Sequence, residues 1–205
     1  MKSSVLLSSI FLLVLVGCNN KQVDPHTYQA SGCPVYTMPD DFVYTGSPTW
    51  SENAYCNSPD CHYFQSSIGV KAFVDTYVAA QADKVPVEIC VFIRRVVGES
   101  RTRWSPLKGK AVTVGGRDYC EGFGFYDLKK YGINSAIAKH LSDQGYTSTG
   151  LGYVIYYATR NVNERTQMTI AYAYNCQFLP DGVLKDEEGF KTFLRTRFAE
   201  RIASS

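Results

Sequence analysis

The residues best suited to chemistry form one short cluster, Cys56-Asn57-Ser58-Pro59-Asp60-Cys61-His62. Its two thiolates, one carboxylate and one imidazole are ligand types that zinc accepts in tetrahedral sites. The C-x4-C spacing followed at once by His differs from common zinc-finger spacing, however, and no second Cys/His pair follows. The Ser-Pro-Asp turn could instead bring the two sulfurs together. We therefore predict a local or nearby disulfide and no metal, and keep a metal-dependent enzyme at Cys56, Asp60, Cys61 and His62 as an alternative.

Other catalytic signatures are weak. Neither G-x-S-x-G nor His-Glu-x-x-His occurs, and His62 and His140 are the histidines of the presumed domain that could serve as bases. The glycines of Glu121–Phe125 lack the third glycine that opens a helix in a dinucleotide fingerprint. Pairs of Asp or Glu could still act as acid and base, but their spacing alone does not reveal them. We expect a protein that is not an enzyme and that needs no cofactor.

The first twenty residues have the pattern of an export signal. Lys2 is followed by an apolar run from Val5 to Val16 and by the small residue Gly17. A run of this length is too short for a membrane-spanning helix, which needs roughly 20 residues. The run ends in Leu15-Val16-Gly17-Cys18, which resembles the lipobox of bacterial lipoproteins.

That resemblance implies a lipid anchor. In this family the cysteine sulfur, here Cys18, receives a diacylglycerol, the preceding peptide (1–17) is removed, and the new amino terminus is acylated. Several acyl chains on one residue give stable anchoring. A residue other than Asp after the cysteine, here Asn19, implies sorting to the outer membrane in enteric-type bacteria. We expect an outer-membrane protein with a flexible tether over 18–31 and a domain that faces the periplasm.

Length and charge limit the kinds of partner. Residues 32–205 are about the size of one domain, with an irregular N-terminal part at 32–66. The chain has 21 basic and 19 acidic residues, a balance that argues against nucleic acid and favours protein or small-molecule partners. In an exported protein the even set of cysteines after the anchor indicates disulfides. The candidates are Cys33, Cys56, Cys61, Cys90, Cys120 and Cys176.

Hydrophobic patterns predict an α+β fold. Val85–Val96 alternates apolar residues and is the clearest strand, at the centre of the core. Ile68–Ala82 fits either a helix or a strand, and its β-branched residues favour a strand at Val70–Val78. The segment 33–63 is rich in turn residues, so we expect cross-links rather than packing to order it.

Two hairpins and two helices complete the prediction. The first hairpin joins 110–114 to 117–126 through Gly115-Gly116, and the second joins 152–160 to 167–178. A capped helix is expected at 134–144 and an amphipathic helix at 186–203, packed on the sheet. The predicted fold is a single α+β domain, mainly an antiparallel sheet of hairpins with a mid-chain helix and a C-terminal amphipathic helix.

The tyrosines of the second hairpin suggest a binding face, because tyrosine offers a large amphipathic contact area. The candidates are Tyr153, Tyr156, Tyr157, Tyr172 and Tyr174. We expect a non-enzymatic protein-binding or assembly module that is anchored in the envelope and binds an envelope protein. The alternative is an inhibitor or immunity protein against a periplasmic hydrolase, which would present a protruding loop at Asn57–Cys61 or Asn161–Thr166.

Overall fold

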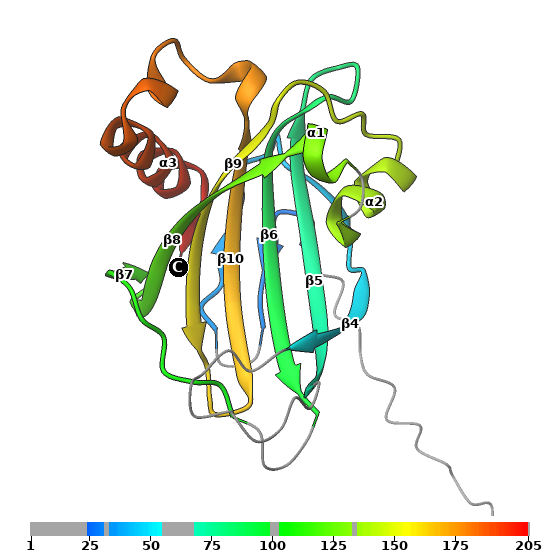
Figure 1. Ribbon diagram of the computed structural model, residues 1–205. Helices are drawn as coiled ribbons and strands as arrows, with labels where there is room; N and C mark the ends of the chain where they lie inside the picture. The colour runs from blue at the N-terminus through cyan, green and yellow to red at the C-terminus, as the bar shows by residue number, and fades with distance from the viewer. Residues whose placement is uncertain (1–23, 31–32, 55–67, 99–102, 133–134, 205) are drawn as a thin grey trace, which may run out of the picture.

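The computed structural model describes residues 24–30, 33–54, 68–98, 103–132 and 135–204 as a single α+β domain. One large antiparallel sheet has the strand order β3-β5-β6-β10-β9-β8-β7, with β4 also paired to β5 (Figure 1). This is the predicted fold class. The strands of this sheet are β3 (Val43–Gly46), β4 (Thr49–Ala54), β5 (Ile68–Ala80), β6 (Pro86–Val97), β7 (Ala111–Val114), β8 (Arg117–Asp127), β9 (Gly152–Asn161) and β10 (Thr166–Asn175).

The central strands follow from their patterns of apolar residues. β6 is buried on both faces over most of its length because it lies between β5 and β10 and is covered from both sides. The ambiguous segment at 68–82 is a strand, β5, and pairs with β6 from Val70 opposite Val97 to Ala80 opposite Pro86. Both predicted hairpins are confirmed. Gly115 and Gly116 adopt φ angles of 59° and 65°, which the tight turn between β7 and β8 requires.

Within the described residues, three α-helices join or follow the strands. α1 (Leu128–Tyr131) and α2 (Ala136–Asp143) connect β8 to β9, and α3 (Glu187–Arg201) follows β10. Short 3-10 turns lie at Cys176–Phe178 and Val183–Lys185. The mid-chain helix and the terminal helix are therefore both confirmed, with boundaries one or two residues inside the predicted ones. α1 and α2 lie over one face of the sheet and α3 packs on the other (Figure 1).

The face under α3, which we call the α3 face, carries the larger core. Alternate side chains of β6, β9 and β10 pack there against Leu194, Phe198 and Ile202. A small sheet of β1 (Thr27–Tyr28), β2 (Tyr36–Thr37) and β11 (Ala203–Ser204) covers the rest of this face. Tyr28 stacks on Phe92 with 4.1 Å between ring centroids, so the N-terminal strands belong to the core.

Two expectations about the N-terminal part were wrong. The tether predicted for 18–31 does not extend through its last residues, because Tyr28 is buried and β1 pairs with β2. The irregular part predicted for 32–66 contains β2, β3 and β4, and Tyr36, Met38 and Phe42 are buried without any cross-link at Cys33. Sequence periodicity missed these strands because the first is two residues long and each of the others pairs with only one neighbour.

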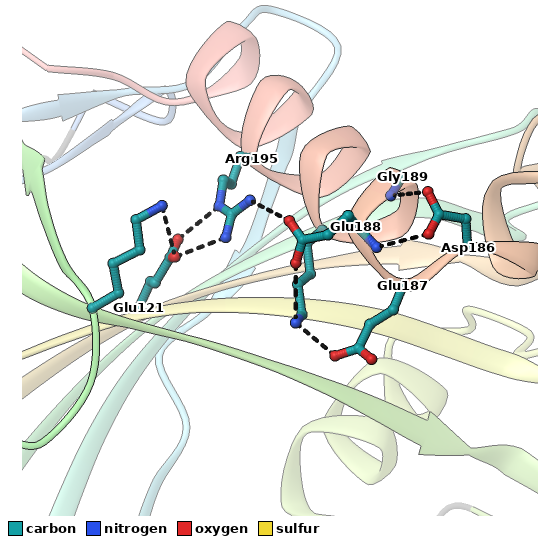
Figure 2. A network of polar contacts seen from close by, with 8 residues as sticks. Glu121, Asp186, Glu187, Glu188, Gly189 and Arg195 are labelled. Atoms are coloured by element: carbon teal, nitrogen blue, oxygen red, sulfur yellow. Dashed lines mark hydrogen bonds and ion pairs between the residues drawn. The ribbon is translucent and has the colours of Figure 1, made fainter.

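Ion pairs fix α3 to the sheet. Arg195 forms a bidentate pair with Glu121 of β8, with nitrogen–oxygen distances of 2.9 and 2.8 Å, and Lys110 approaches the same carboxylate (Figure 2). Glu88 of β6, with its side chain 3% exposed, accepts hydrogen bonds from Arg197 and Arg201. At the helix start the Asp186 carboxylate accepts from the backbone N–H groups of Glu188 and Gly189 (Figure 2).

Candidate functional site

The face opposite α3, which we call the α2 face, contains a cavity of about 510 Å³. The floor of the cavity is formed by β6, β8, β9 and β10, and its walls by α2 and by the segment at 107–108. This volume lies within the ~300–1,000 Å³ that small-molecule sites occupy. Its apolar lining includes Ile89, Val91, Ile93, Leu107, Leu128, Ile137, Leu141, Tyr153, Ile155 and Tyr157.

Strand register explains why this face is hollow. Ala171 of β10 lies opposite Val91 of β6 and opposite Tyr157 of β9. Ala173 follows two residues later in β10 and therefore points to the same face. These two alanines form the middle of the floor, while the larger branched and aromatic side chains stand on either side. Because successive residues of a strand point to opposite faces, the small side chains of β10 leave a groove on the α2 face alone.

Glycines of β8 widen the floor on one side. Gly122 lies opposite Tyr157 of β9, and a β-carbon at Gly122 would come within 3.3 Å of the Tyr157 ring. A β-carbon at Gly124 would come within 2.1 Å of the Tyr157 hydroxyl oxygen. The glycines therefore let the tyrosine ring lie flat over β8, where it forms part of the cavity lining.

The sequence around α2 positions it as a wall of the cavity. Ser135 accepts a hydrogen bond from the Ala138 N–H at 3.0 Å, which caps the start of the helix. At its other end Gly145 has a φ of 81°, and the Tyr146 N–H donates to the Leu141 carbonyl at 3.0 Å. Leu141 is buried against the sheet, so the short helix is held over the apolar end of the cavity.

The end of the cavity furthest from α2 is polar. Thr159 and Thr169 face each other across β9 and β10 with 3.1 Å between their hydroxyl oxygens, and Arg95 donates to the Thr169 hydroxyl at 3.3 Å. Lys108 lines the same end, in a segment held to the sheet edge by a hydrogen bond from the Asn161 amide to the Ser105 carbonyl at 2.9 Å. The cavity therefore runs from an apolar end beneath α2 to a polar end with two basic residues.

The charged residues that line the cavity are Arg95, Lys108 and Glu121. Glu121 is the acidic residue among the described residues that line the cavity, but its carboxylate bonds to Arg195 on the α3 face. That ion pair lowers the pKa of Glu121, so the carboxylate is charged and neutralised away from the cavity. Burial raises the pKa of the Tyr157 hydroxyl, which stays neutral.

The predicted tyrosine face is divided between the two sides of the sheet. Tyr156, Tyr172 and Tyr174 are buried on the α3 face, where Tyr156 and Tyr172 pack against Phe198, so they cannot form an exposed binding surface. Tyr153 and Tyr157 lie on the α2 face and line the cavity. The prediction combined odd and even positions of β9, which the alternation of a strand sends to opposite faces.

The described cysteines are all free. Cys90 is fully buried in the core under α3, and Cys33, Cys120 and Cys176 are partly buried free thiols. The predicted complete set of disulfides is therefore not found among the described cysteines. The cluster at Cys56–His62 lies outside the described residues, as does Cys18, and the disulfide expected between Cys56 and Cys61 stays a prediction.

Elsewhere in the described part of the chain, potentially catalytic or metal-binding side chains do not cluster. No group of three or more His, Cys, Asp and Glu side chains there is arranged to hold a metal ion. The buried Nε2 atom of His140 makes no hydrogen bond to a described residue. The loop Asn161–Thr166, expected to protrude in an inhibitor, is tied to its neighbours, since Glu164 pairs with Arg103 at 2.8 Å and accepts from the Trp104 N–H at 2.8 Å.

As candidate binding residues, sequence reasoning identified Tyr153 and Tyr157 but none of the other residues that line the cavity. The signals that could have found them are the alternating small residues Ala171 and Ala173 in an otherwise bulky strand, and the glycines of β8. The neighbouring residues Arg94 and Arg95 point to opposite faces of the sheet. Arg95 faces the cavity, whereas Arg94 packs over the Phe73 ring at 4.4 Å.

Comparisons with known proteins do not supply a function. The chain matches no protein-family model, no curated protein and no solved structure. Within the described residues no helix is long and apolar enough to span a membrane. The features that bear on function are therefore the geometry of the cavity and the N-terminal sequence.

Proposed function

We propose that this protein is a lipid-anchored, non-enzymatic binding module of the bacterial envelope, whose binding site is the cavity on the α2 face. The observation that carries the proposal is a mostly apolar cavity of small-molecule size, floored by four strands of a well-packed sheet. Rigid scaffolds with apolar pockets and a few polar groups are typical of ligand sites.

The cavity favours binding over chemistry. Its polar groups are the hydroxyls of serines, threonines and tyrosines, the Cys120 thiol, the Gln167 amide and two basic side chains. None of the described lining residues forms a nucleophile–base pair. Each methylene group that moves from water into such a lining gains about 0.8 kcal/mol. An occupant with a handful of buried carbons would therefore bind without a covalent step.

The proposed location rests on the N-terminal sequence. Leu15-Val16-Gly17-Cys18 after an apolar run supports acylation at Cys18, and Asn19 supports transfer to the outer membrane with the domain on the periplasmic side. A protein partner in the envelope remains part of this proposal, because a carrier or sensor of small molecules must pass its ligand or signal to another component. The buried tyrosines of the α3 face do not support docking through that side.

Binding of a neutral apolar probe tests the cavity. We expect N-phenyl-1-naphthylamine to bind the protein with enhanced fluorescence and to lose this binding in Ala171→Leu, which fills the floor. Ala111→Leu is the matched control, because Ala111 is an exposed strand position outside the cavity. Equal probe binding by both variants, or none by the wild type, would refute the cavity as the site. Mass spectrometry of Cys18 in the native protein tests the anchor separately.

A further inference from the structure

We infer that the ligand of this cavity is an uncharged, largely apolar molecule with one hydrogen-bond acceptor, such as a carbonyl oxygen, which accepts from the Tyr153 hydroxyl beneath α2. This inference rests on the proposed function, because it takes the cavity to be the binding site. It adds the chemical class of the ligand and the residue that selects it.

Tyr153 combines burial with an unused hydrogen-bonding group. The residue lines the cavity and is 4% exposed. Its hydroxyl oxygen is buried and makes no hydrogen bond to a described residue. Buried polar groups of folded proteins are nearly always paired. An unpaired hydroxyl in the wall of a cavity of small-molecule size therefore points to a partner that comes from outside the chain.

The Tyr153 hydroxyl keeps its proton and can donate it. Burial raises the pKa of this hydroxyl, and the nearby Ser148 side chain lowers it by less, so the phenol is neutral at neutral pH. Ser148 and Tyr153 lie close enough to interact, but the two hydroxyls do not have hydrogen-bond geometry. The Tyr153 proton therefore has no acceptor among the described residues.

Other hydroxyls at this end of the cavity are already engaged. The Tyr126 hydroxyl donates to the Gly132 carbonyl at 2.8 Å, and the Ser135 hydroxyl caps the start of α2. Tyr153, with Ser148 beside it, is left to recognise a polar atom of a ligand. A carbonyl oxygen is the simplest group that matches a single O–H donor.

The surroundings of Tyr153 favour a neutral acceptor over an ion. Tyr153 packs in one apolar cluster with Leu128, Ile137 and Leu141, all of which also line the cavity. An ionised group among these side chains would lose its hydration without a compensating partner, whereas a neutral carbonyl needs only one donor. The rest of the ligand meets aliphatic side chains and must therefore be apolar.

Two ligands of nearly equal shape isolate the acceptor. Acetophenone carries a carbonyl oxygen at the position where α-methylstyrene carries a methylene group. Each is titrated into the full chain carrying Cys18→Ser, which removes the predicted acylation sulfur, and the affinity is measured from backbone amide chemical shifts. We expect both ligands to bind and to shift the amides of Tyr153 and Ala171.

Tyr153→Phe, made in the same chain, removes the donor and keeps the ring. The variant should bind acetophenone at least about five-fold more weakly, because the buried carbonyl loses its partner. Its affinity for α-methylstyrene should not fall. Its urea midpoint should not fall either, because the hydroxyl has no described partner in the free protein. Tyr174→Phe is the matched control: it removes a hydroxyl that donates to the Phe178 carbonyl on the α3 face, and it should change neither affinity.

Each contrary result has its own meaning. If Tyr153→Phe weakens both ligands alike, or neither, the inference is overturned while the cavity remains a binding site. The second of these results would mean that water satisfies the hydroxyl. If N-phenyl-1-naphthylamine binds but acetophenone and α-methylstyrene do not, the inference is overturned and the proposed function stands. If none of the three binds, both fail.

Discussion

Glu88→Gln tests whether buried charge holds α3 on the sheet. The Glu88 side chain is 3% exposed and accepts hydrogen bonds from Arg197 and from Arg201, the latter with 2.5 Å between Nε and Oε2. Glutamine keeps the shape of the side chain but removes its charge, and its amide group would place a donor against guanidinium donors. The substitution therefore leaves two positive charges without their shared anion.

The expected magnitude follows from the exposure of the arginines. Removing one partner of a buried ion pair costs about 3–5 kcal/mol. Arg197 is 33% exposed and regains some water, whereas Arg201 is 16% exposed and keeps Asp41 as a partner. We therefore expect the lower end of that range, about 3 kcal/mol of unfolding free energy. For a domain of this size that corresponds to a fall in Tm of about 6–12 °C.

Urea unfolding followed by circular dichroism measures this loss. Glu187→Gln is the matched control, because Glu187 pairs with Lys191 on the same helix while its side chain is 78% exposed. Its loss should change stability by less than about 0.5 kcal/mol, since exposed ion pairs contribute little. The reasoning is refuted if the two variants lose the same free energy, or if Glu88→Gln unfolds at the wild-type urea concentration.

Three further outcomes are expected. Ser135→Ala should lower stability by about 1 kcal/mol, measured by urea unfolding, because it removes the cap of α2, and an unchanged midpoint would contradict the capping role. Gly124→Ala should cost about 1–3 kcal/mol and exceed the cost of Gly122→Ala, since only the former forces the overlying tyrosine hydroxyl to move; the reverse order would contradict the packing described. The pKa of Glu121 is lowered by its bond to Arg195, so its stabilisation is complete above the ordinary carboxyl pKa of about 4.3 and is lost as pH falls through the lowered value. Glu121→Gln should therefore flatten the acid limb of a stability–pH curve, and an unaltered acid limb would argue against the linkage.

Local patterns predicted much of the fold. The alternation in 85–96, the paired glycines at 115–116, the caps of the mid-chain helix and the amphipathic spacing of the terminal helix each identified an element that the structure contains. These signals are local, because each depends on residues a few positions apart. Local signals therefore predicted individual strands and helices. They did not predict the strand order of the sheet, because that order depends on contacts between distant segments.

The candidate site could not be predicted in the same way. The cavity depends on Ala171 of β10 lying beside Val91 of β6 and Tyr157 of β9, and only register brings these residues together. The ion pairs of α3 were also missed, although a glutamate within the most apolar strand was a visible sign. A charge at Glu88 needs a partner when its strand is buried, but the partners Arg197 and Arg201 lie 109 and 113 residues away in the sequence, beyond the reach of a local pattern.

The most direct test of the cavity as a ligand site is a map of backbone amide chemical shifts during a titration with N-phenyl-1-naphthylamine. If the probe occupies the cavity as proposed, the amides of Ile93, Ala171 and Tyr157 should shift together and saturate with one affinity, while those of α3 remain in place. Shifts centred on α3, or no saturable shifts on the α2 face, would contradict the central claim that this cavity is a ligand site.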